Sequence, residues 1–325
     1  MNLRFAPLLA LVALSACAPR TADPVPGAAQ PEATSLLGQP LHSPALAPAT
    51  SERLERDLVE ARAAYDAAPD DPDALIWLGR RTAYLGRYRD AIEIFSEGIR
   101  KHPADARMYR HRGHRYITVR ELDRALADFE RAAELIRGRP DEVEPDGMPN
   151  RFNIPTSTLH SNIWYHLGLA HYLRGGFERA LDAYHKAMRV SDNDDMLVAT
   201  SDWLYMTLRR LGRDDEAARV LERIQPGMNI LENQAYHRRL LMYKGLLPPE
   251  SLLDSSSDDP VEIATQGYGV GNWYLYNGDE ARAREIFERV LEATNWAAFG
   301  YIAAEAELRR MQSGIGRMPG SAAPR

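Results

Sequence analysis

The stretch from Leu78 to Pro103, LGRRTAYLGRYRDAIEIFSEGIRKHP, decides the fold of this chain of 325 residues. Its pattern returns 34 residues later, where Gly113 stands in the place of Gly79. After each glycine a large apolar residue, an alanine and a phenylalanine follow in the same register. Self-similarity at a fixed period of this length is typical of stacked helical units, each of which buries its apolar face against its neighbours.

Three more copies continue the pattern. The fourth copy is degenerate, because the bulky Tyr205 stands where the small residue belongs, and we expect altered helix packing there. The third and fifth copies match well. The third carries Trp164, Leu167, Gly168, His171, Gly175, Phe177, Ala180, Tyr184 and Ala187, and the fifth carries Gly271, Tyr274, Gly278, Ala283, Phe287 and Val290.

These copies resemble the tetratricopeptide repeat, in which a small eighth residue lets helix A approach helix B. The resemblance implies an all-α, right-handed superhelix of about five repeats, a class that usually binds proteins or peptides. Residues 52–67, 231–243 and 297–311 have helical spacing and should flank or cap the repeats. No strand alternation or βαβ pattern is present.

The amino terminus predicts a secretory signal peptide, residues 1–16, because the apolar run from Phe5 to Ala13 is too short to span a bilayer. Its end, Leu14-Ser15-Ala16-Cys17, resembles the bacterial lipobox, which implies lipidation of Cys17. An ordinary signal peptide with a chance cysteine is the alternative. The resemblance also implies a lipid-anchored protein of the cell envelope, and Ala18 implies the periplasmic face of the outer membrane in a Gram-negative host.

Residues 17–50 are rich in proline and alanine and poor in aromatics, so we expect a flexible tether after the lipidated cysteine. The repeats should fill residues 51–312, and residues 313–325 should form a disordered tail.

Composition excludes several classes of protein. With 40 basic and 46 acidic side chains and a formal charge of -6, the chain lacks the positive field that nucleic-acid binding needs. Its single cysteine excludes an intrachain disulfide framework and zinc sites that need several cysteines. No catalytic motif is found, so we expect a protein that is not an enzyme and holds no cofactor or metal.

Three groups of residues could carry chemistry. Gly267, Gly269 and Gly271 suggest either a phosphate loop or close helix contact, and the missing strand favours close contact. The acidic run 142–146 suggests either the start of a calcium loop or a solvated acidic loop. His111 and His114 stand among arginines, which disfavour a bound cation.

The positions that line the concave groove in the repeat family predict a groove that is aromatic and, toward its amino-terminal end, positive. These candidate partner-binding residues are Arg80, Tyr84, Arg110, His114, Tyr165, Tyr172, Trp203, Tyr268, Asn272 and Tyr276. A solvated basic face and an inter-repeat core remain equal alternatives for the arginines and the tyrosines. Ile76 at a lysine position argues against recognition of a peptide carboxy terminus.

The insertion from Pro140 to His160 is longer than connections in a compact array normally are, which favours a lid or a second contact surface beside the groove. We therefore expect a membrane-anchored protein-interaction scaffold. The alternative is a small-ligand or glycan-binding module with hydrolytic activity, with Asp202 as a polar handle beside Trp203. That alternative requires a second carboxylate at catalytic separation.

Overall fold

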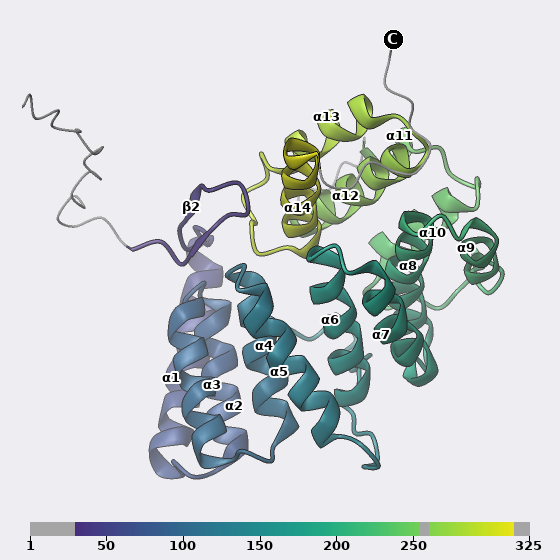
Figure 1. The fold of residues 1–325 in the computed structure, drawn as a ribbon. Helices are drawn as coiled ribbons and strands as arrows, with labels where there is room; N and C mark the ends of the chain where they lie inside the picture. The colour runs from purple at the N-terminus through teal and green to yellow at the C-terminus, as the bar shows by residue number, and fades with distance from the viewer. Residues whose placement is uncertain (1–29, 254–259, 315–325) are drawn as a thin grey trace, which may run out of the picture. The chain divides into compact units, whose positions relative to one another are not determined.

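The computed structural model describes residues 30–253 and 260–314, and within them the chain is built from helices and one small hairpin (Figure 1). The signal peptide, Cys17 and residues 315–325 lie outside the described residues. The predicted all-α solenoid of helix pairs is confirmed. Its five pairs are α2 (Pro72–Tyr84) with α3 (Tyr88–Lys101), α4 (Ala106–Thr118) with α5 (Leu122–Leu135), α6 (Leu159–Leu173) with α7 (Phe177–Val190), α8 (Asp194–Arg210) with α9 (Asp214–Leu221), and α12 (Pro260–Tyr276) with α13 (Glu280–Val290).

Four of the described helices lie outside these pairs, and three of them match the flanking helices that the sequence predicts. These three are α1 (Pro48–Ala67), α10 (Gln234–Tyr243) and α14 (Phe299–Ser313), and the fourth is the short α11 (Glu250–Leu253). Figure 1 shows α1 to α7 as an array of neighbouring helices, with α12 to α14 gathered beyond α6. None of the described helices is both long enough and apolar enough to cross a bilayer.

Each well-formed pair is held by a glycine of its first helix against a ring of its second helix. A Cβ atom built on Gly79 would lie 2.5 Å from the Phe95 ring, and one on Gly168 would lie 2.7 Å from the Tyr184 ring. The same contact joins Gly113 to Phe129 and Gly271 to Phe287. All four rings are buried, so these glycines allow the helix axes to approach around a buried ring.

The fourth pair departs from this rule, as the bulky Tyr205 suggests. Instead of admitting a ring from α9, Tyr205 stacks on Tyr243 of α10, with ring centroids 4.5 Å apart and planes 11° apart. Helix α9 is correspondingly short, with eight residues. The extra helix α10 therefore takes over packing that the second helix of the pair provides elsewhere.

The turn between the paired helices needs a residue with positive φ, and glycine supplies it in four of the five pairs, at residues 86, 175, 212 and 278. The second pair has Arg120 there, with φ 66°. Its guanidinium lies 2.9 Å from the Glu305 carboxylate of α14 and donates to the Trp296 carbonyl at 2.8 Å. The left-handed backbone thus aims a buried cation at the carboxy-terminal helix.

Helix α14 folds back onto the first helices of the repeats through two buried glutamates. Beside Glu305, the Glu307 Oε1 atom lies 2.6 Å from both the Arg210 and the Arg310 guanidinium groups. Burial alone would raise the pKa of Glu307, but the two arginines lower it to about 2. Because the carboxylates and arginines lose their water together, each depends on its partner for stability.

The expectation of a flexible tether over residues 17–50 is corrected for its last part. Residues 31–47 pack against the solenoid. Strands β1 (Ala33–Thr34) and β2 (Pro40–Leu41) form a hairpin that buries Ala33 and Leu41. The Leu36 amide donates to Glu305 at 3.1 Å, and the Trp296 indole donates to the His42 carbonyl at 2.6 Å. Composition alone missed this docking because a few apolar side chains, Ala33, Leu36, Leu37 and Leu41, and a few polar contacts suffice on an existing surface.

Substitution of Gly168 tests the contact between paired helices. Gly168→Ala should lower the free energy of unfolding by about 1–3 kcal/mol, because the added methyl group overlaps the Tyr184 ring. Urea unfolding followed by circular dichroism measures this change. Gly227→Ala is the matched control, since nothing lies within 4 Å of the added carbon. Equal stability of the two variants would contradict the proposed role of the glycine.

Candidate functional site

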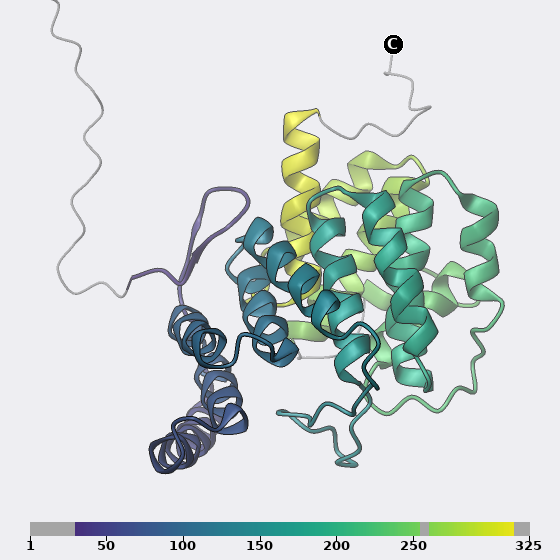
Figure 2. The same cartoon turned by 60° about the horizontal axis from the view of Figure 1, so that its bottom comes forward.

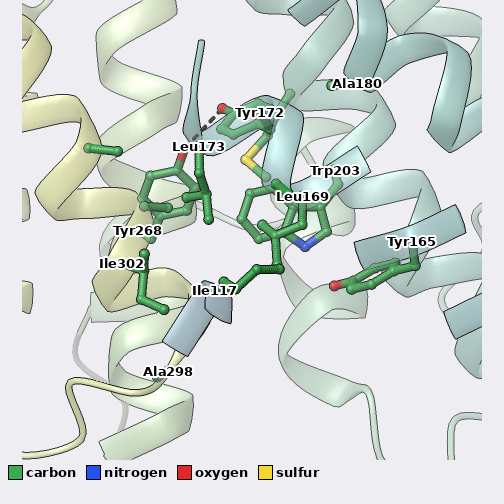
Figure 3. Packing of buried hydrophobic residues seen from close by; sticks show 14 of the residues in the cluster. Ile117, Tyr165, Leu169, Tyr172, Leu173, Ala180, Trp203, Tyr268, Ala298 and Ile302 are labelled. Carbon is green, nitrogen blue, oxygen red and sulfur yellow. Dashed lines mark hydrogen bonds between the residues drawn. The ribbon is translucent and has the colours of Figure 1, made fainter. Parts of the chain in front are cut away.

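The aromatic part of the expected groove forms a buried cluster where α6, α8 and α12 meet. The Tyr268 hydroxyl donates to the Tyr172 hydroxyl at 2.9 Å, and the Asn272 amide donates to the same oxygen at 2.9 Å. Trp203 stacks on Tyr268 with centroids 5.7 Å apart (Figure 3). The structure therefore brings these four predicted residues together, but as core.

Two further aromatic candidates are buried as well. Tyr165 donates to the Tyr236 hydroxyl of α10 at 3.1 Å, and Tyr276 packs under the Arg209 guanidinium. The expectation of an open aromatic groove is thus corrected. Helix α12 packs against α8 and α10, while α14 reaches α6, so side chains that would face a ligand face other helices.

Asp202 has a cation as its partner rather than the second carboxylate that hydrolysis would need. The Arg239 Nη2 atom lies 2.8 Å from Asp202 Oδ2, and both side chains are 0% exposed. Burial raises the pKa of Asp202 although Arg239 opposes the shift. Gly269 of α12 leaves room for the guanidinium, while Gly267 and Gly271 contact side chains of α13, so these glycines serve close helix contact and not phosphate binding.

The basic part of the expected groove lies on α2 and α4, and the insertion after α5 lies directly on it. We call residues 140–158 the strap. The Glu144 carboxylate of the strap lies 3.0 Å from the Arg110 guanidinium and accepts a hydrogen bond from the Asn162 amide at 3.1 Å. Glu144 is as buried as Arg110, so the calcium-loop alternative is wrong for this residue.

The residues after Glu144 present main-chain carbonyls to two arginines of α2. Arg80 donates to the Pro145 carbonyl at 2.8 Å, and Arg81 donates to the Gly147 carbonyl at 3.0 Å. Gly147 also lies so close to the Tyr84 hydroxyl that a side chain there would overlap it. The structure therefore places Arg80, Tyr84 and Arg110 side by side, with a segment of the chain itself seated on them.

The other half of the strap is fastened to the fourth repeat. Glu232, between α9 and α10, accepts hydrogen bonds from the Asn150 amide and the Thr156 hydroxyl. The Asn193 amide, at the start of α8, donates to the Thr156 carbonyl at 2.8 Å. The strap thus runs from the first repeat to the fourth, and Figure 2 shows it as a long loop at the bottom of the view.

The strap exposes apolar side chains to solvent along this path. Val143 is 63% exposed, and the others are about half exposed: Met148, Phe152 and Ile154. Sequence reasoning noted the length of this insertion but missed the roles of Glu144 and Glu232. The signal that could have revealed Glu144 is the acidic run 142–146 lying next to a basic groove in a chain of repeats.

Comparison with known proteins identifies the repeating unit. Residues 78–142, which span α3, α4 and α5, match the family model described as "Tetratricopeptide repeat". This part of the chain is similar to tetratricopeptide repeats. Proteins built from such repeats act as interaction scaffolds for proteins or peptides and are typically not catalytic.

The similar proteins that follow are distant from this chain in sequence. The chain is 24% identical over 160 residues to "BBSome complex member BBS4" of Bos taurus, a stretch that covers 48% of this chain and 27% of BBS4. This chain therefore spans about a quarter of the length of that relative. The solved structure of YrrB, a tetratricopeptide repeat protein with an unusual peptide-binding site, is 16% identical, with a TM-score of 0.41, and covers 76% of this chain and 97% of YrrB. The crystal structure of MamA is also 16% identical, with a TM-score of 0.41, and the match covers 62% of this chain and 89% of MamA.

The basic face formed by α2 and α4 has more positive than negative charge. Among the described residues, Arg80 and Arg115 have no carboxylate within ion-pairing distance, and Arg110 has only Glu144. Burial lowers the pKa of Arg115 to about 10, and Arg110 and Arg80 add repulsion. Burial also lowers the pKa of Arg110, although Glu144 opposes the shift. An additional negative charge on this face would therefore stabilise the protonated arginines.

Three histidines lie beside these arginines, His111 and His114 on α4 and His166 on α6. The rings of His114 and His166 lie 4.7 Å apart, and His111 stacks on Phe95. Burial, reinforced by the positive charge of Arg110, lowers the pKa of His166 to about 3 and lowers the pKa values of His111 and His114 well below 6.5. All three rings are therefore neutral at pH 7, and they pack as aromatic side chains rather than as metal ligands.

These pKa shifts predict a stability that depends on pH. The folded chain keeps His166 neutral, whereas the unfolded chain binds a proton near pH 6.5, so stability is present above that pH and is lost as the pH falls toward 3. His166→Phe should remove about 2 kcal/mol of the stability difference between pH 7.5 and pH 5.0. Urea unfolding at both pH values measures this difference. His185→Gln, on the exposed side of α7, should leave it unchanged, and a His166→Phe chain with the native pH dependence would contradict the assignment.

Proposed function

We propose that this protein is an interaction scaffold which a lipidated Cys17 anchors in the envelope of a bacterium. The solenoid would bind a protein partner through the strap and the basic face of α2 and α4, and the lipid would hold it at a membrane. Tetratricopeptide repeats support the scaffold role. The stretch from Leu14 to Cys17, which resembles a lipobox, supports the anchor.

The observation that carries the scaffold proposal is the strap itself. It crosses from the first repeat to the fourth, and it keeps Val143, Met148, Phe152 and Ile154 exposed to solvent. Exposed apolar side chains gathered on one segment are typical of a surface that another protein covers. The buried Asp202–Arg239 pair and the core position of Trp203 and Tyr268 argue against the alternative of an enclosed ligand site.

Photo-crosslinking in the native host tests the scaffold proposal. A photoreactive residue placed at Val143, Met148 or Phe152 should trap a discrete protein that mass spectrometry identifies. Glu93 of α3 and Glu130 of α5 are exposed controls on the second helices of their pairs and should trap nothing in common with the strap sites. Identical adducts at strap and control sites, or no adduct at the strap in a folded and correctly located protein, would overturn the proposal.

Substitution of Cys17 tests the anchor. Cys17→Ala should remove the site of lipidation, so the protein should move from the membrane fraction to the soluble fraction after cell lysis. Cys17→Ser, which keeps the size of the side chain, is the matched variant and should behave in the same way. Continued sedimentation of both variants with membranes would contradict anchoring through Cys17.

A further inference from the structure

The face beneath the strap carries three arginines but receives one carboxylate. Arg80 extends from α2, and Arg110 and Arg115 extend from α4, and the positive charge of Arg80 acts on both of the others. Of these three arginines, Glu144 of the strap pairs only with Arg110. Among the described residues, the guanidinium groups of Arg80 and Arg115 therefore have no carboxylate within ion-pairing distance. Arg80 is nevertheless buried, with 9% of the residue exposed.

Hydrogen-bond donors on this face are also incompletely used. Arg110 is 8% exposed, and its Nε atom is buried and has no hydrogen-bond acceptor. Arg80 donates only to neutral groups, the Pro145 carbonyl and the Tyr84 hydroxyl. A buried donor without an acceptor costs free energy, so a ligand that brings a second carboxylate would improve the pairing of this face.

The strap holds this face by contacts that another segment can reproduce. They come from one short stretch, the Glu144 carboxylate followed by the carbonyls of Pro145 and Gly147. The neighbouring Val143 and Met148 remain exposed, so no large apolar side chain anchors these residues to the groove. With few buried apolar contacts, this stretch can open locally while the helices beneath it stay folded, provided that another carboxylate takes the place of Glu144 on Arg110.

We propose that the α2–α4 face is a binding site for an acidic, turn-forming segment of a protein partner, and that Glu144 to Gly147 occupy this site until the partner replaces them. The inference rests on the proposed scaffold function and adds the chemistry of the partner. An incoming segment places one carboxylate on Arg110 and a second near Arg115 or Arg80, which the strap leaves without one. The displaced strap, still tethered at both ends, presents its apolar residues to the same partner.

A labelled peptide with the strap's own sequence, Asp141 to Pro149, tests the proposal by fluorescence anisotropy on the full chain. The native chain should bind it weakly, because the tethered Glu144 competes at an effective concentration of about 1 mM. Glu144→Gln should bind it about tenfold more tightly or better, since the competing carboxylate is gone. A control peptide with glutamine in the place of Glu144 should bind at least about tenfold more weakly than the acidic peptide.

A second variant guards against misfolding of Glu144→Gln. Replacement of residues 143–149 by seven glycine and serine residues removes the competitor without placing a substitution on the arginine face, and circular dichroism checks its folding. This chain should also bind the acidic peptide tightly, and Arg110→Gln in the same chain should abolish the gain. Equal affinity of native and strap-replaced chains, or tight binding that survives Arg110→Gln, would overturn the proposal. Strap crosslinks to a partner would in that case still support the scaffold function.

Discussion

The structure depends on one contact, a glycine of the first helix of a pair set against a buried ring of the second. It lets the two helices of a pair approach closely at Gly79, Gly113, Gly168 and Gly271. Where the contact is absent, at Tyr205, the chain adds α10 and shortens α9. The regular pairs and the irregular fourth pair thus follow from the same steric rule, since a methyl group is too large for these interfaces.

The turns that connect the paired helices also help to fix α14 on the first helices of the repeats. Arg120 takes the left-handed turn position that glycine takes elsewhere, and its buried guanidinium meets Glu305 of α14. Glu307 meets Arg210 in the same way. Because each charge would be costly without its partner, α14 is fixed across the first helices of the repeats. Tyr172, Trp203 and Tyr268 consequently pack as core, and the basic face of α2 and α4 remains for a partner.

The sequence was informative where structure is periodic and weak where it joins distant parts. Period and residue size were sufficient to predict the helix pairs, the flanking helices and the disturbed fourth repeat. Contacts such as Arg120 with Glu305 have no local signal, because the two residues lie 185 positions apart. The same reason explains why aromatic side chains assigned to a groove are core, and why Ala33 and Leu41 of the expected tether are ordered. Glu144 lay in a stretch whose acidity was visible, but its charge partner is in another repeat.

Docking of the strap depends both on the array of first helices and on the positive charge that α2 and α4 carry. Hydrogen exchange at the Glu144 amide, which donates to the Ser157 carbonyl at 3.1 Å, measures that docking most directly. We expect protection of this amide in the native chain and exchange at least about tenfold faster in Arg110→Gln, while the buried Leu169 amide of α6 stays unchanged. Equal exchange of the Glu144 amide in the two chains would show that docking of the strap does not depend on the arginine beneath it.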